Sequence, residues 1–397
     1  MTFDSEMRIE RGTSAPPNTT PRNAAAPAKS LMALVTAYHY AAFAAPPVLD
    51  PAGSTSSFAD VGYGGNSGAA NVWETTPQVG SGYAISFHTD NTVLEMAPPL
   101  GTGDPTQVVG FRYKHNAPVS STILTYFDDY WATPTIYVVV NSSYYLEVWR
   151  NDTTAPVLLT TSSAPIDTTA WLYLELKVLC DAASGSVDLH VNGTSVATFA
   201  GVTKTNQQGD SWNVGFTLQN GVSQPGCFDD LYVLDSTDPH SIGRNTDFLG
   251  PRCVWTLRPS ADSSVQWTPS SGSNNYSLVR DINGPDGDAT YVEAATAGLK
   301  DKYVCDSLPA GVGDISGLTI FADARSDGSV SFSLLGFVYS TGGGGGTEFD
   351  GPSIASGSGL NTTYTSPYLA ICETDPDTSA QWTASSNNSS LLGVGTV

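Results

Sequence analysis

The carboxylates and histidines of this chain are spaced in a way that does not favour catalysis. Hydrolysis of a glycosidic bond with retention needs two carboxyl groups about 5 Å apart. The strand-like run 171–179 offers Glu175 alone, with Lys177 and Leu179 where a second acid would stand. No two of the five histidines lie two or four residues apart, so zinc binding and a Ser-His-Asp triad lack support; they are His39, His88, His115, His190 and His240. The sequence therefore predicts a protein that is not an enzyme.

An aromatic and acidic cluster at 126–131 is the best candidate for binding a sugar. Aromatic faces stack on sugar rings, and carboxylates accept hydrogen bonds from hydroxyl groups. The cluster also lies at a strand end, where aromatic side chains commonly cover the core, and this interpretation stays open beside the first. The candidate glycan contacts are Tyr126, Asp128, Asp129, Tyr130 and Trp131.

Calcium is the only metal that the spacing of the acids suggests, and no other cofactor is expected. Asp281, Asp286 and Asp288 could converge on a hard cation, as could Asp375 and Asp377. The Gly-Pro-Asp-Gly sequence at 284–287 is also typical of an ordinary turn, so a purely structural role is the alternative.

Composition and charge exclude several classes of partner. The chain has 397 residues, 40% of them hydrophobic and 14% charged, and a net charge of −22. A chain this acidic repels phosphate backbones, which argues against nucleic acid. The N-terminus has charges where a signal peptide needs an apolar core, and no run reaches the roughly 18 apolar residues of a membrane span. We expect a protein that is made in the cytoplasm, is not secreted and does not insert into a membrane.

The five cysteines are widely spaced, and no two of them form a C-x-x-C motif. They are Cys180, Cys227, Cys253, Cys305 and Cys372. This spacing favours buried thiols over a metal site or a disulfide framework. A Cys227–Cys253 bridge is the alternative that stays open.

The candidate residues must be positioned by β-strands, because short apolar runs follow one another closely from residue 31 to 243. In 171–179, leucine and valine alternate with polar and aromatic residues, as in a half-solvated antiparallel strand. Asn192-Gly193 predicts a two-residue hairpin turn. The run 227–235 reads as the last, central strand, and about a dozen strands in this region predict two packed antiparallel sheets.

A second β module is expected from 244 to 397. Its clearest feature is a short internal repeat, in which Gln266-Trp267-Thr268 recurs as Gln381-Trp382-Thr383. A tryptophan between a polar loop and a strand is expected to anchor the end of a sandwich; the alternative is a paired sugar-stacking platform. The glycine run 342–346 is predicted to be a flexible loop.

Residues 1–30 differ from the rest because they are rich in proline steps and show no evident strand pattern. Arg8, Arg11, Arg22 and Lys29 outweigh three acids, so the segment carries +1 and the remainder carries −23. Such a segment extends instead of folding alone. It is either a floppy terminus or an arm that docks on an acidic partner.

The first domain resembles the concanavalin A-like (LamG-type) jelly roll. The resemblance lies in W-x-x-L-E-L-K at 171–177, G-S-V-D-L-H-V-N-G-T at 185–194 and F-D-D-L-Y-V-L at 228–234. It implies a jelly-roll sandwich at 31–243. With the composition of 1–30 and the strand pattern of the second half, we expect an all-β chain that has an extended N-terminal arm at 1–30 and a smaller β-sandwich at 244–397. It implies no particular activity, since this sandwich hosts lectins, glycosidases and structural modules.

The second half resembles a virion protein of tailed bacteriophages and prophages. The resemblance rests on D-F-L-G-P-R at 247–252, Q-W-T-P-S-x-G-S-N at 266–274, P-D-G-D-x-T-Y-V at 285–292, K-D-x-Y at 300–303 and E-T-D-P-D-T-x-x-x-W-T at 373–383.

This second resemblance implies a non-enzymatic structural protein located in the virion. The implied position is on the tail, as a fibre or accessory protein that forms homo-oligomers. The N-terminal arm lies outside this resemblance, and we expect it to contact other virion proteins. Two alternatives stay open: a capsid decoration or head-fibre protein, and a module that binds glycans on the host surface.

Overall fold

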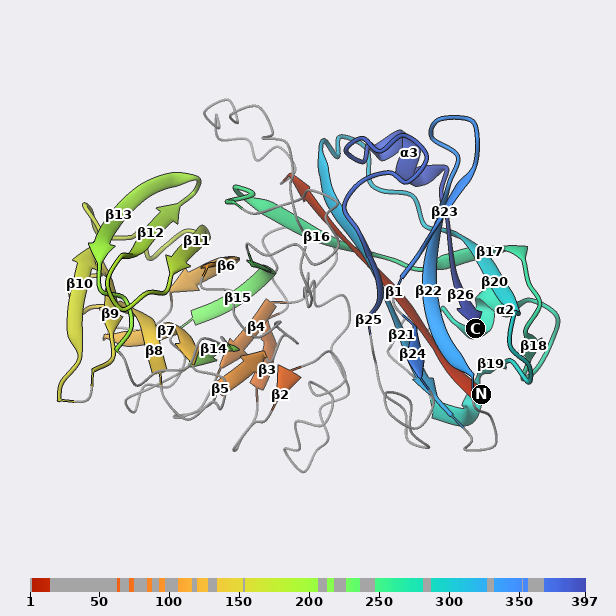
Figure 1. Cartoon of the computed structure of the whole chain (residues 1–397), viewed down its shortest axis with the longest axis horizontal. Helices are drawn as coiled ribbons and strands as arrows, with labels where there is room; N and C mark the ends of the chain where they lie inside the picture. The colour runs from red at the N-terminus through yellow and green to blue at the C-terminus, as the bar shows by residue number, and fades with distance from the viewer. Residues whose placement is uncertain are drawn as a thin grey trace. The chain divides into compact units, whose positions relative to one another are not determined.

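The computed structural model of the chain describes residues 2–14, 63–64, 71–74, 84–87, 93–96, 106–115, 120–127, 134–152, 154–205, 213–217, 226–235, 247–280, 287–326, 332–351, 353–355 and 368–397. Most of these residues lie in strands and the turns between them (Figure 1). They form two compact units that divide between Arg252 and Cys253, and the N-terminal strand belongs to the second. No helix in the described part of the chain is long and apolar enough to cross a membrane.

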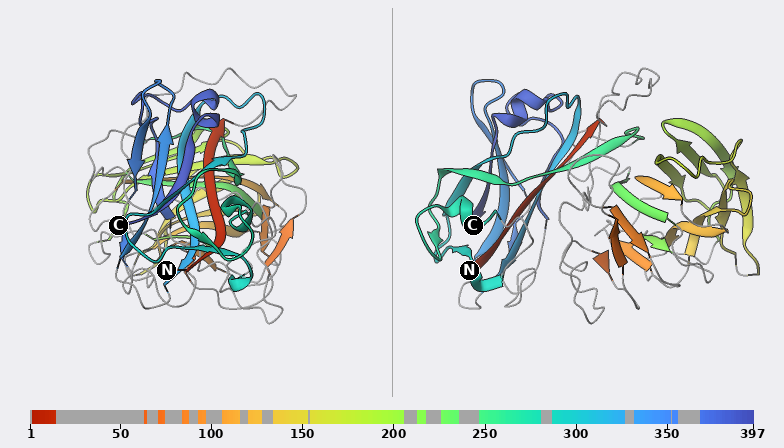
Figure 2. Two further views of the ribbon diagram at one scale, coloured as in Figure 1. Left: turned by 90° about the vertical axis from the view of Figure 1, so that its right-hand side faces the viewer. Right: turned by 180° about the vertical axis from the view of Figure 1, so that it is seen from behind.

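The first unit, which we call the jelly-roll unit, contains two antiparallel sheets, each of seven strands among the described residues (Figures 1 and 2). The strands of the β8 sheet are β2 (Tyr63–Gly64), β5 (Val93–Met96), β7 (Ser121–Phe127), β8 (Pro134–Val140), β9 (Leu146–Arg150), β10 (Val157–Thr161) and β14 (Asn213–Thr217). Those of the β11 sheet are β3 (Asn71–Glu74), β4 (Ala84–Phe87), β6 (Thr106–His115), β11 (Leu172–Leu179), β12 (Gly185–Val191), β13 (Thr194–Gly201) and β15 (Gly226–Asp235).

The strand orders are β10-β9-β8-β7-β14-β5-β2 and β13-β12-β11-β6-β15-β4-β3. Non-consecutive neighbours such as β11 and β6, or β14 and β5, are the crossovers of a jelly roll. The prediction of a concanavalin A-like sandwich is confirmed, and β15, at 226–235, lies inside its sheet between β6 and β4.

The core of the jelly-roll unit lies between its two sheets. Leu174 and Leu176 of β11 are buried there together with Ile136 and Val138 of β8. The period-2 alternation of each strand explains this, since every second side chain points to the inner face. At the β12–β13 hairpin, Asn192 and Gly193 have φ values of 51° and 80°. Positive φ at both central residues is what a type I′ turn requires, so the predicted turn is confirmed.

The second unit, which we call the C-terminal unit, also consists of two antiparallel sheets. The β21 sheet contains β1 (Thr2–Ser14), β16 (Arg252–Leu257), β18 (Thr268–Pro269), β19 (Tyr291–Glu293), β21 (Ile315–Arg325) and β25 (Tyr368–Cys372). The β22 sheet contains β17 (Pro259–Ser264), β20 (Lys300–Cys305), β22 (Ser333–Ser340), β23 (Thr347–Asp350), β24 (Ile354–Ala355) and β26 (Leu391–Thr396). Short helices interrupt the strands: α2 (Asn275–Leu278), η1 (Gly287–Ala289) and α3 (Ala384–Asn388).

The two tryptophans of the short internal repeat, Trp267 and Trp382, anchor the core of the C-terminal unit. Trp267 and Trp382 are both buried, and the Trp382 indole N–H donates to the carbonyl of Cys372 at 3.0 Å. The anchor prediction is confirmed. The alternative of a sugar-stacking platform is wrong, because neither ring offers a face to solvent.

The N-terminal segment departs from the arm expected from the sequence. Its described part, 2–14, is β1, which pairs with β19 and β21 and so lies inside a sheet of its own chain. Arg8 stands opposite Phe321, Arg11 stands opposite Leu318, and Arg22 lies outside the described residues. The overlooked signal is alternation: Phe3, Met7 and Ile9 are separated by charged residues, which is typical of a strand. A docking role for these arginines stays a prediction.

The glycine run 342–346 forms an ordered turn around one carboxylate instead of a loose loop. The N–H groups of Gly343 and Gly345 donate to Asp377 at 2.6 and 3.3 Å, and the Thr347 hydroxyl donates at 2.9 Å. The Thr347 bond, followed by the backbone bonds, lowers the pKa of Asp377. Gly344 has φ 85°, a conformation that glycine adopts without strain.

Three of the four described cysteines are buried thiols, as the sequence predicts, and the fourth is not fully buried. Cys180, Cys253 and Cys372 are buried, and Cys305 is partly exposed. The Cys372 thiol contacts the carbonyl of Thr374 at 3.1 Å. The side chain of Cys227 lies outside the described residues, so a Cys227–Cys253 bridge stays untested.

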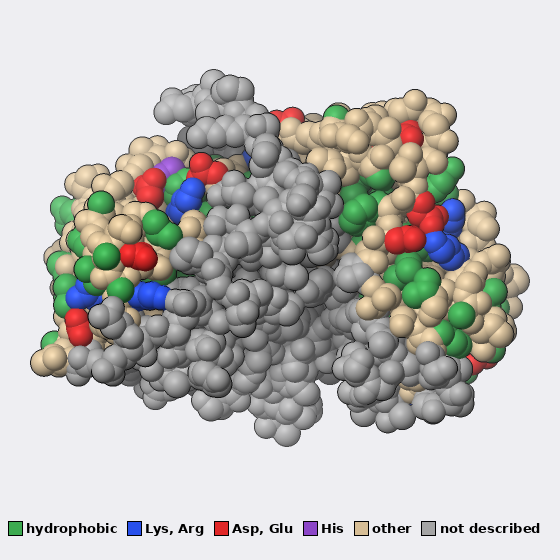
Figure 3. Space-filling model, in the orientation of Figure 1, with side chains coloured by type: hydrophobic (Ala, Val, Ile, Leu, Met, Phe, Trp, Pro, Cys, Tyr) green, Lys and Arg blue, Asp and Glu red, His purple; other side chains and the backbone are tan. Residues whose placement is uncertain are grey.

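Charges of both signs lie close together on the face shown in Figure 3. On the β22 sheet, Lys300 pairs with Glu348 and Asp350, and Lys302 pairs with Glu348. The ammonium group of Lys302 also lies 4.4 Å above the ring centroid of Tyr339. The partly exposed Tyr339 ring therefore already has a partner on one face.

Candidate functional site

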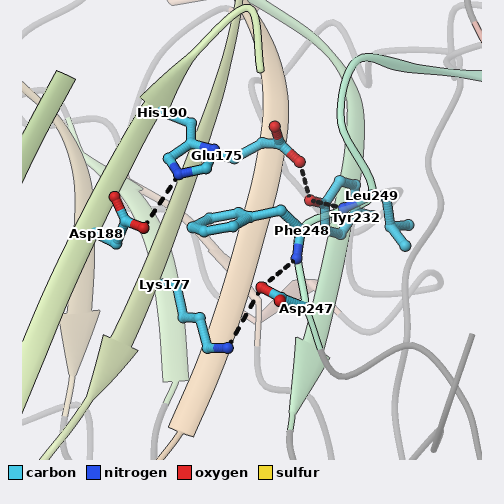
Figure 4. A network of polar contacts seen from close by, with 8 residues as sticks. All are labelled: Glu175, Lys177, Asp188, His190, Tyr232, Asp247, Phe248 and Leu249. Carbon is cyan, nitrogen blue, oxygen red and sulfur yellow. Dashed lines mark hydrogen bonds and ion pairs between the residues drawn. The ribbon is translucent and has the colours of Figure 1, made fainter. Parts of the chain in front are cut away.

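The outer face of the β11 sheet is covered by a segment of the same unit, 247–250 (Figure 4). Phe248 stacks on His190, with ring centroids 3.8 Å apart, and Asp247 pairs with Lys177 at 3.3 Å. The N–H of Leu249 donates to the Tyr232 hydroxyl at 3.1 Å. These contacts shield this part of the sheet from solvent. Tyr232 is therefore only 1% exposed, although its side chain lies on the side of the sheet away from the core.

Glu175 lies at the centre of this covered face and is 0% exposed. Its Oε1 accepts hydrogen bonds from the Tyr232 hydroxyl and, at 2.7 Å, from the N–H of Gly250. Its Oε2 has no hydrogen-bond partner among the described residues. The neighbouring acids are engaged elsewhere: Asp188 bonds to His190 and Asp247 to Lys177. Glu175 is therefore a packed scaffold residue that solvent does not reach.

Replacing Glu175 by glutamine is expected to change how stability depends on pH. Burial raises the pKa of Glu175, and the bonds from Tyr232 and Gly250 only partly oppose it. A carboxyl group with a higher pKa in the folded state contributes stability that is fully present below its unfolded pKa, about 4.3. That stability is lost as pH rises to the folded pKa. The free energy of unfolding of Glu175→Gln relative to the wild type should therefore increase over this pH window and level off above it.

Urea denaturation of both proteins at a series of pH values measures this difference. A difference that stays constant from acidic to neutral pH would contradict an elevated pKa for Glu175.

An ion pair, Arg112–Asp230, fixes the neighbouring part of the same face. Both side chains are almost fully buried, at 3% and 4% exposure. Asp230 has φ 49°, a left-handed conformation that aspartate tolerates better than most residues. The Tyr173 hydroxyl donates to the Asp230 carbonyl at 3.2 Å, and Arg112 donates to the Arg252 carbonyl at 3.2 Å. Asp230 therefore has a structural role in this face of the sheet.

The outer face of the β8 sheet differs because it carries two aromatic side chains that are partly exposed. Tyr137 of β8 and Trp149 of β9 are directly paired across the strands, and their side chains are partly exposed. Their rings are nearly parallel, with an interplanar angle of 5° and centroids 6.5 Å apart. Residues paired in register project to the same face of a sheet, so the two stacked rings lie together on this face.

The strand register extends this pair into a row across the sheet. Thr125 of β7 pairs with Tyr137, and Leu158 of β10 pairs with Trp149. Leu158 is 43% exposed, so the end of the row is apolar and open to solvent. In the other direction the register continues through Gly215 to Glu95. We call Thr125, Tyr137, Trp149 and Leu158 the aromatic row; Thr125 is buried at 2% exposure, so the exposed part of the row is Tyr137, Trp149 and Leu158.

A carboxylate is held at the edge of the aromatic row. Glu147 lies two residues before Trp149 on the same face of β9, and its Oε2 accepts from the Trp149 indole N–H at 3.0 Å. Its Oε1 accepts from the Asn141 amide at 2.7 Å. Each carboxylate oxygen has two lone pairs, so each retains the capacity to accept another bond. The row thus combines apolar ring faces with a positioned acceptor, which is the chemistry a sugar requires.

The residues predicted to contact glycan are not the ones in the aromatic row. Tyr126 is fully buried in the core, where its hydroxyl donates to the Leu176 carbonyl at 3.2 Å, so its prediction as a contact is wrong. Its position one residue from Thr125 turns it to the inner face. The other four candidates, Asp128, Asp129, Tyr130 and Trp131, lie outside the described residues.

The acids predicted to bind calcium are dispersed or engaged where they are described. Asp288 is exposed and pairs with Arg325 at 2.7 Å, while Asp281 and Asp286 lie outside the described residues. Asp375 accepts from the N–H of Asp377 at 3.0 Å, as part of the turn around the glycine run. Within the described ranges, no three His, Cys, Asp or Glu side chains are grouped so that they could hold a metal ion.

Sequence reasoning missed Tyr137, Trp149 and Glu147, although a signal was present. Tyr137 and Trp149 each stand between residues of the inner face, in strands that the sequence predicts. The five residues 141–145 between β8 and β9 set the register Val140 to Leu146, which brings Tyr137 opposite Trp149.

The fold is a jelly-roll sandwich that is followed by a second β-sandwich. No model of a known protein family matches the chain, and no curated protein sequence matches it.

Among solved structures, the chain is similar to an endo-β-1,4-glucuronan lyase from the fungus Trichoderma reesei, with 12% identity over 47% of this chain and 95% of that one, at a TM-score of 0.36. It is similar to domain 4 of AbnA, an arabinanase of Geobacillus stearothermophilus in complex with arabinotriose, with 15% identity over 51% of this chain and 93% of that one, at a TM-score of 0.34. It is also similar to the carbohydrate-binding module CBM66 of Bacillus subtilis, with 11% identity over 41% of this chain and 96% of that one, at a TM-score of 0.27.

Proposed function

We propose that this protein binds carbohydrate, and that the aromatic row on the β8 sheet is its binding surface. The observation that carries the proposal is the parallel, partly exposed pair of Tyr137 and Trp149 with Glu147 beside it. The C–H faces of a pyranose pack on aromatic rings, while its hydroxyl groups donate to a carboxylate. The row crosses several strands, so an extended chain fits it better than a single terminal sugar.

The face fits binding without bond cleavage. Glu147 is the one acid in the described strands β7, β8, β9 and β10, and glycoside hydrolysis needs a pair. An open sheet surface binds weakly with a single site, so repetition of the site in an oligomer would raise the avidity. We therefore propose a non-enzymatic protein that acts as a homo-oligomer.

The virion resemblance adds a second candidate role, that of a structural subunit of a phage particle, either on the tail or as a capsid decoration. This candidate rests on the sequence resemblance, and the described parts of the motifs that carry it have structural roles. D-F-L-G covers the β11 sheet, Trp267 and Trp382 anchor the core, and Asp377 organises the glycine turn. A structural subunit that contacts a host-surface glycan would satisfy both candidates.

Replacing Trp149 by alanine is expected to weaken carbohydrate binding by about tenfold or more, since loss of a stacked ring removes on the order of 1.4 kcal/mol. Tyr137→Ala should weaken it in the same direction. The intact protein is first screened on a glycan array, and titration calorimetry with the glycans that bind then compares the variants. Far-ultraviolet circular dichroism verifies that each variant is folded.

The matched control is Tyr339→Ala, which removes a partly exposed tyrosine from the outer face of a sheet in the other unit. It should leave affinity unchanged. Equal affinity of wild type, Tyr137→Ala and Trp149→Ala would overturn the proposal, as would an array on which the intact protein binds nothing.

A further inference from the structure

We propose that the aromatic row selects neutral glycans against glycans that carry carboxylates, and that Glu147 is the residue that sets this specificity. The proposal rests on the proposed function and names the class of ligand: uncharged pyranose chains, with uronate- and sialate-containing chains excluded.

Glu147 is held rigidly by partners that leave its charge unbalanced. Both of its donors, the Asn141 amide and the Trp149 indole, are uncharged. The Asn141 amide is itself fixed, because its oxygen accepts from the N–H groups of Ser143 at 2.9 Å and Tyr145 at 3.0 Å. That leaves its NH₂ group to donate to Glu147. A fixed carboxylate without a cationic partner accepts from sugar hydroxyl groups and repels another carboxylate.

No positive charge on the strands of this sheet offsets Glu147. Across β2, β5, β7, β8, β9, β10 and β14, the single basic residue is Arg150. Arg150 is engaged, since it pairs with Asp152 at 3.0 Å and donates to the Val202 carbonyl at 2.8 Å. The register of the aromatic row leads instead to a second acid, Glu95. The net charge of −22 for the whole chain acts in the same direction.

Acidic glycans are normally recognised by arginine or lysine, which bind carboxylates through charge-assisted hydrogen bonds. The described strands of the β8 sheet lack such a group in a free state, since Arg150 already has its partners. A glycan carboxylate on the aromatic row would lose its hydration and would be repelled by the negative charge of Glu147. The wild-type protein should therefore bind neutral chains at least tenfold more tightly than their acidic counterparts.

The test uses matched pairs of ligands that differ only in charge. Neutral gluco-, galacto- and manno-configured oligosaccharides are compared with the same chains after oxidation of their primary hydroxyl groups to carboxylates. Calorimetry gives the neutral-to-oxidised affinity ratio for each protein. For Glu147→Gln, which keeps the size of the side chain, neutral affinity should fall, because an amide oxygen accepts more weakly than a carboxylate. The ratio of neutral to oxidised affinity should still fall at least fivefold, because the like charge that repels the oxidised chain is gone. In 1 M salt, where the screening length falls to about 3 Å, the wild-type ratio should also shrink.

Glu293→Gln is the control, because it removes one negative charge from an exposed position of the C-terminal unit and leaves the aromatic row intact. Its ratio should equal that of the wild type. The proposal is overturned if wild type binds the oxidised chains as well as the neutral ones, or if Glu147→Gln leaves the ratio unchanged. If neither set binds, or if Trp149→Ala binds both as the wild type does, the proposed function itself fails.

Discussion

Replacing Arg112 by alanine is expected to lower the free energy of unfolding of the jelly-roll unit by about 3–5 kcal/mol. The variant leaves Asp230 buried at 4% exposure without its cationic partner, and it removes the bond that holds the Arg252 carbonyl. An uncompensated buried charge is far more costly than a broken surface pair. For a domain of this size the loss corresponds to a decrease in Tm of about 6–20 °C.

Differential scanning calorimetry of the full chain measures this effect. The matched control is Lys177→Ala, which breaks an ion pair on the same face with side chains 33% and 50% exposed. It should cost less than about 1 kcal/mol, because solvent screens it. The double variant Arg112→Met with Asp230→Asn should recover part of the loss, since no buried charge is left alone. If Arg112→Ala were no worse than Lys177→Ala, the buried pair would not be fixing this face.

Replacing Asp301 by alanine is expected to destabilise the C-terminal unit by about 4 kcal/mol. The Asp301 carboxylate is 0% exposed and accepts four hydrogen bonds. The donors are the N–H groups of Gln266 and Trp267, the Asn275 amide and the Tyr303 hydroxyl. Without the carboxylate these buried donors lose their partner, at about 1–3 kcal/mol for each group left unsatisfied, and the losses are not additive.

Chemical denaturation followed by tryptophan fluorescence measures this loss of stability, because the backbone N–H of Trp267 donates a hydrogen bond to Asp301. Asp288→Ala is the control: Asp288 forms an exposed ion pair with Arg325, and its loss should cost less than about 1 kcal/mol. A small effect of Asp301→Ala, comparable to that control, would show that the Gln-Trp-Thr loop is held by packing alone.

Local patterns in the sequence predict much of the jelly roll, because the determinants are local. Alternation in 171–179 gives the inner face of β11, and Asn192-Gly193 gives the hairpin that follows. The anchoring role of Trp267 and Trp382 follows from their position between a polar loop and a strand. In each case a few neighbouring residues carry the whole signal.

What escaped prediction depends on contacts between distant segments. Nothing near Glu175 in sequence indicates that 247–250 covers it, about seventy residues later. The proline-rich composition of 1–30 obscured the alternation in 2–14 that β1 uses to pair with β21. The aromatic row is a property of strand register, so Tyr137 and Trp149 look like ordinary strand residues until their pairing is known.

The most direct test of the central claim, that the aromatic row binds carbohydrate, is hydroxyl-radical footprinting with and without a saturating neutral oligosaccharide. Trp149 and Tyr137 are partly exposed and should be oxidised in the free protein, whereas buried Trp267 and Trp382 provide internal references. The account predicts that the glycan protects Trp149 and Tyr137 and leaves Tyr339 unchanged. Equal oxidation of Trp149 and Tyr137 with and without bound glycan would contradict it.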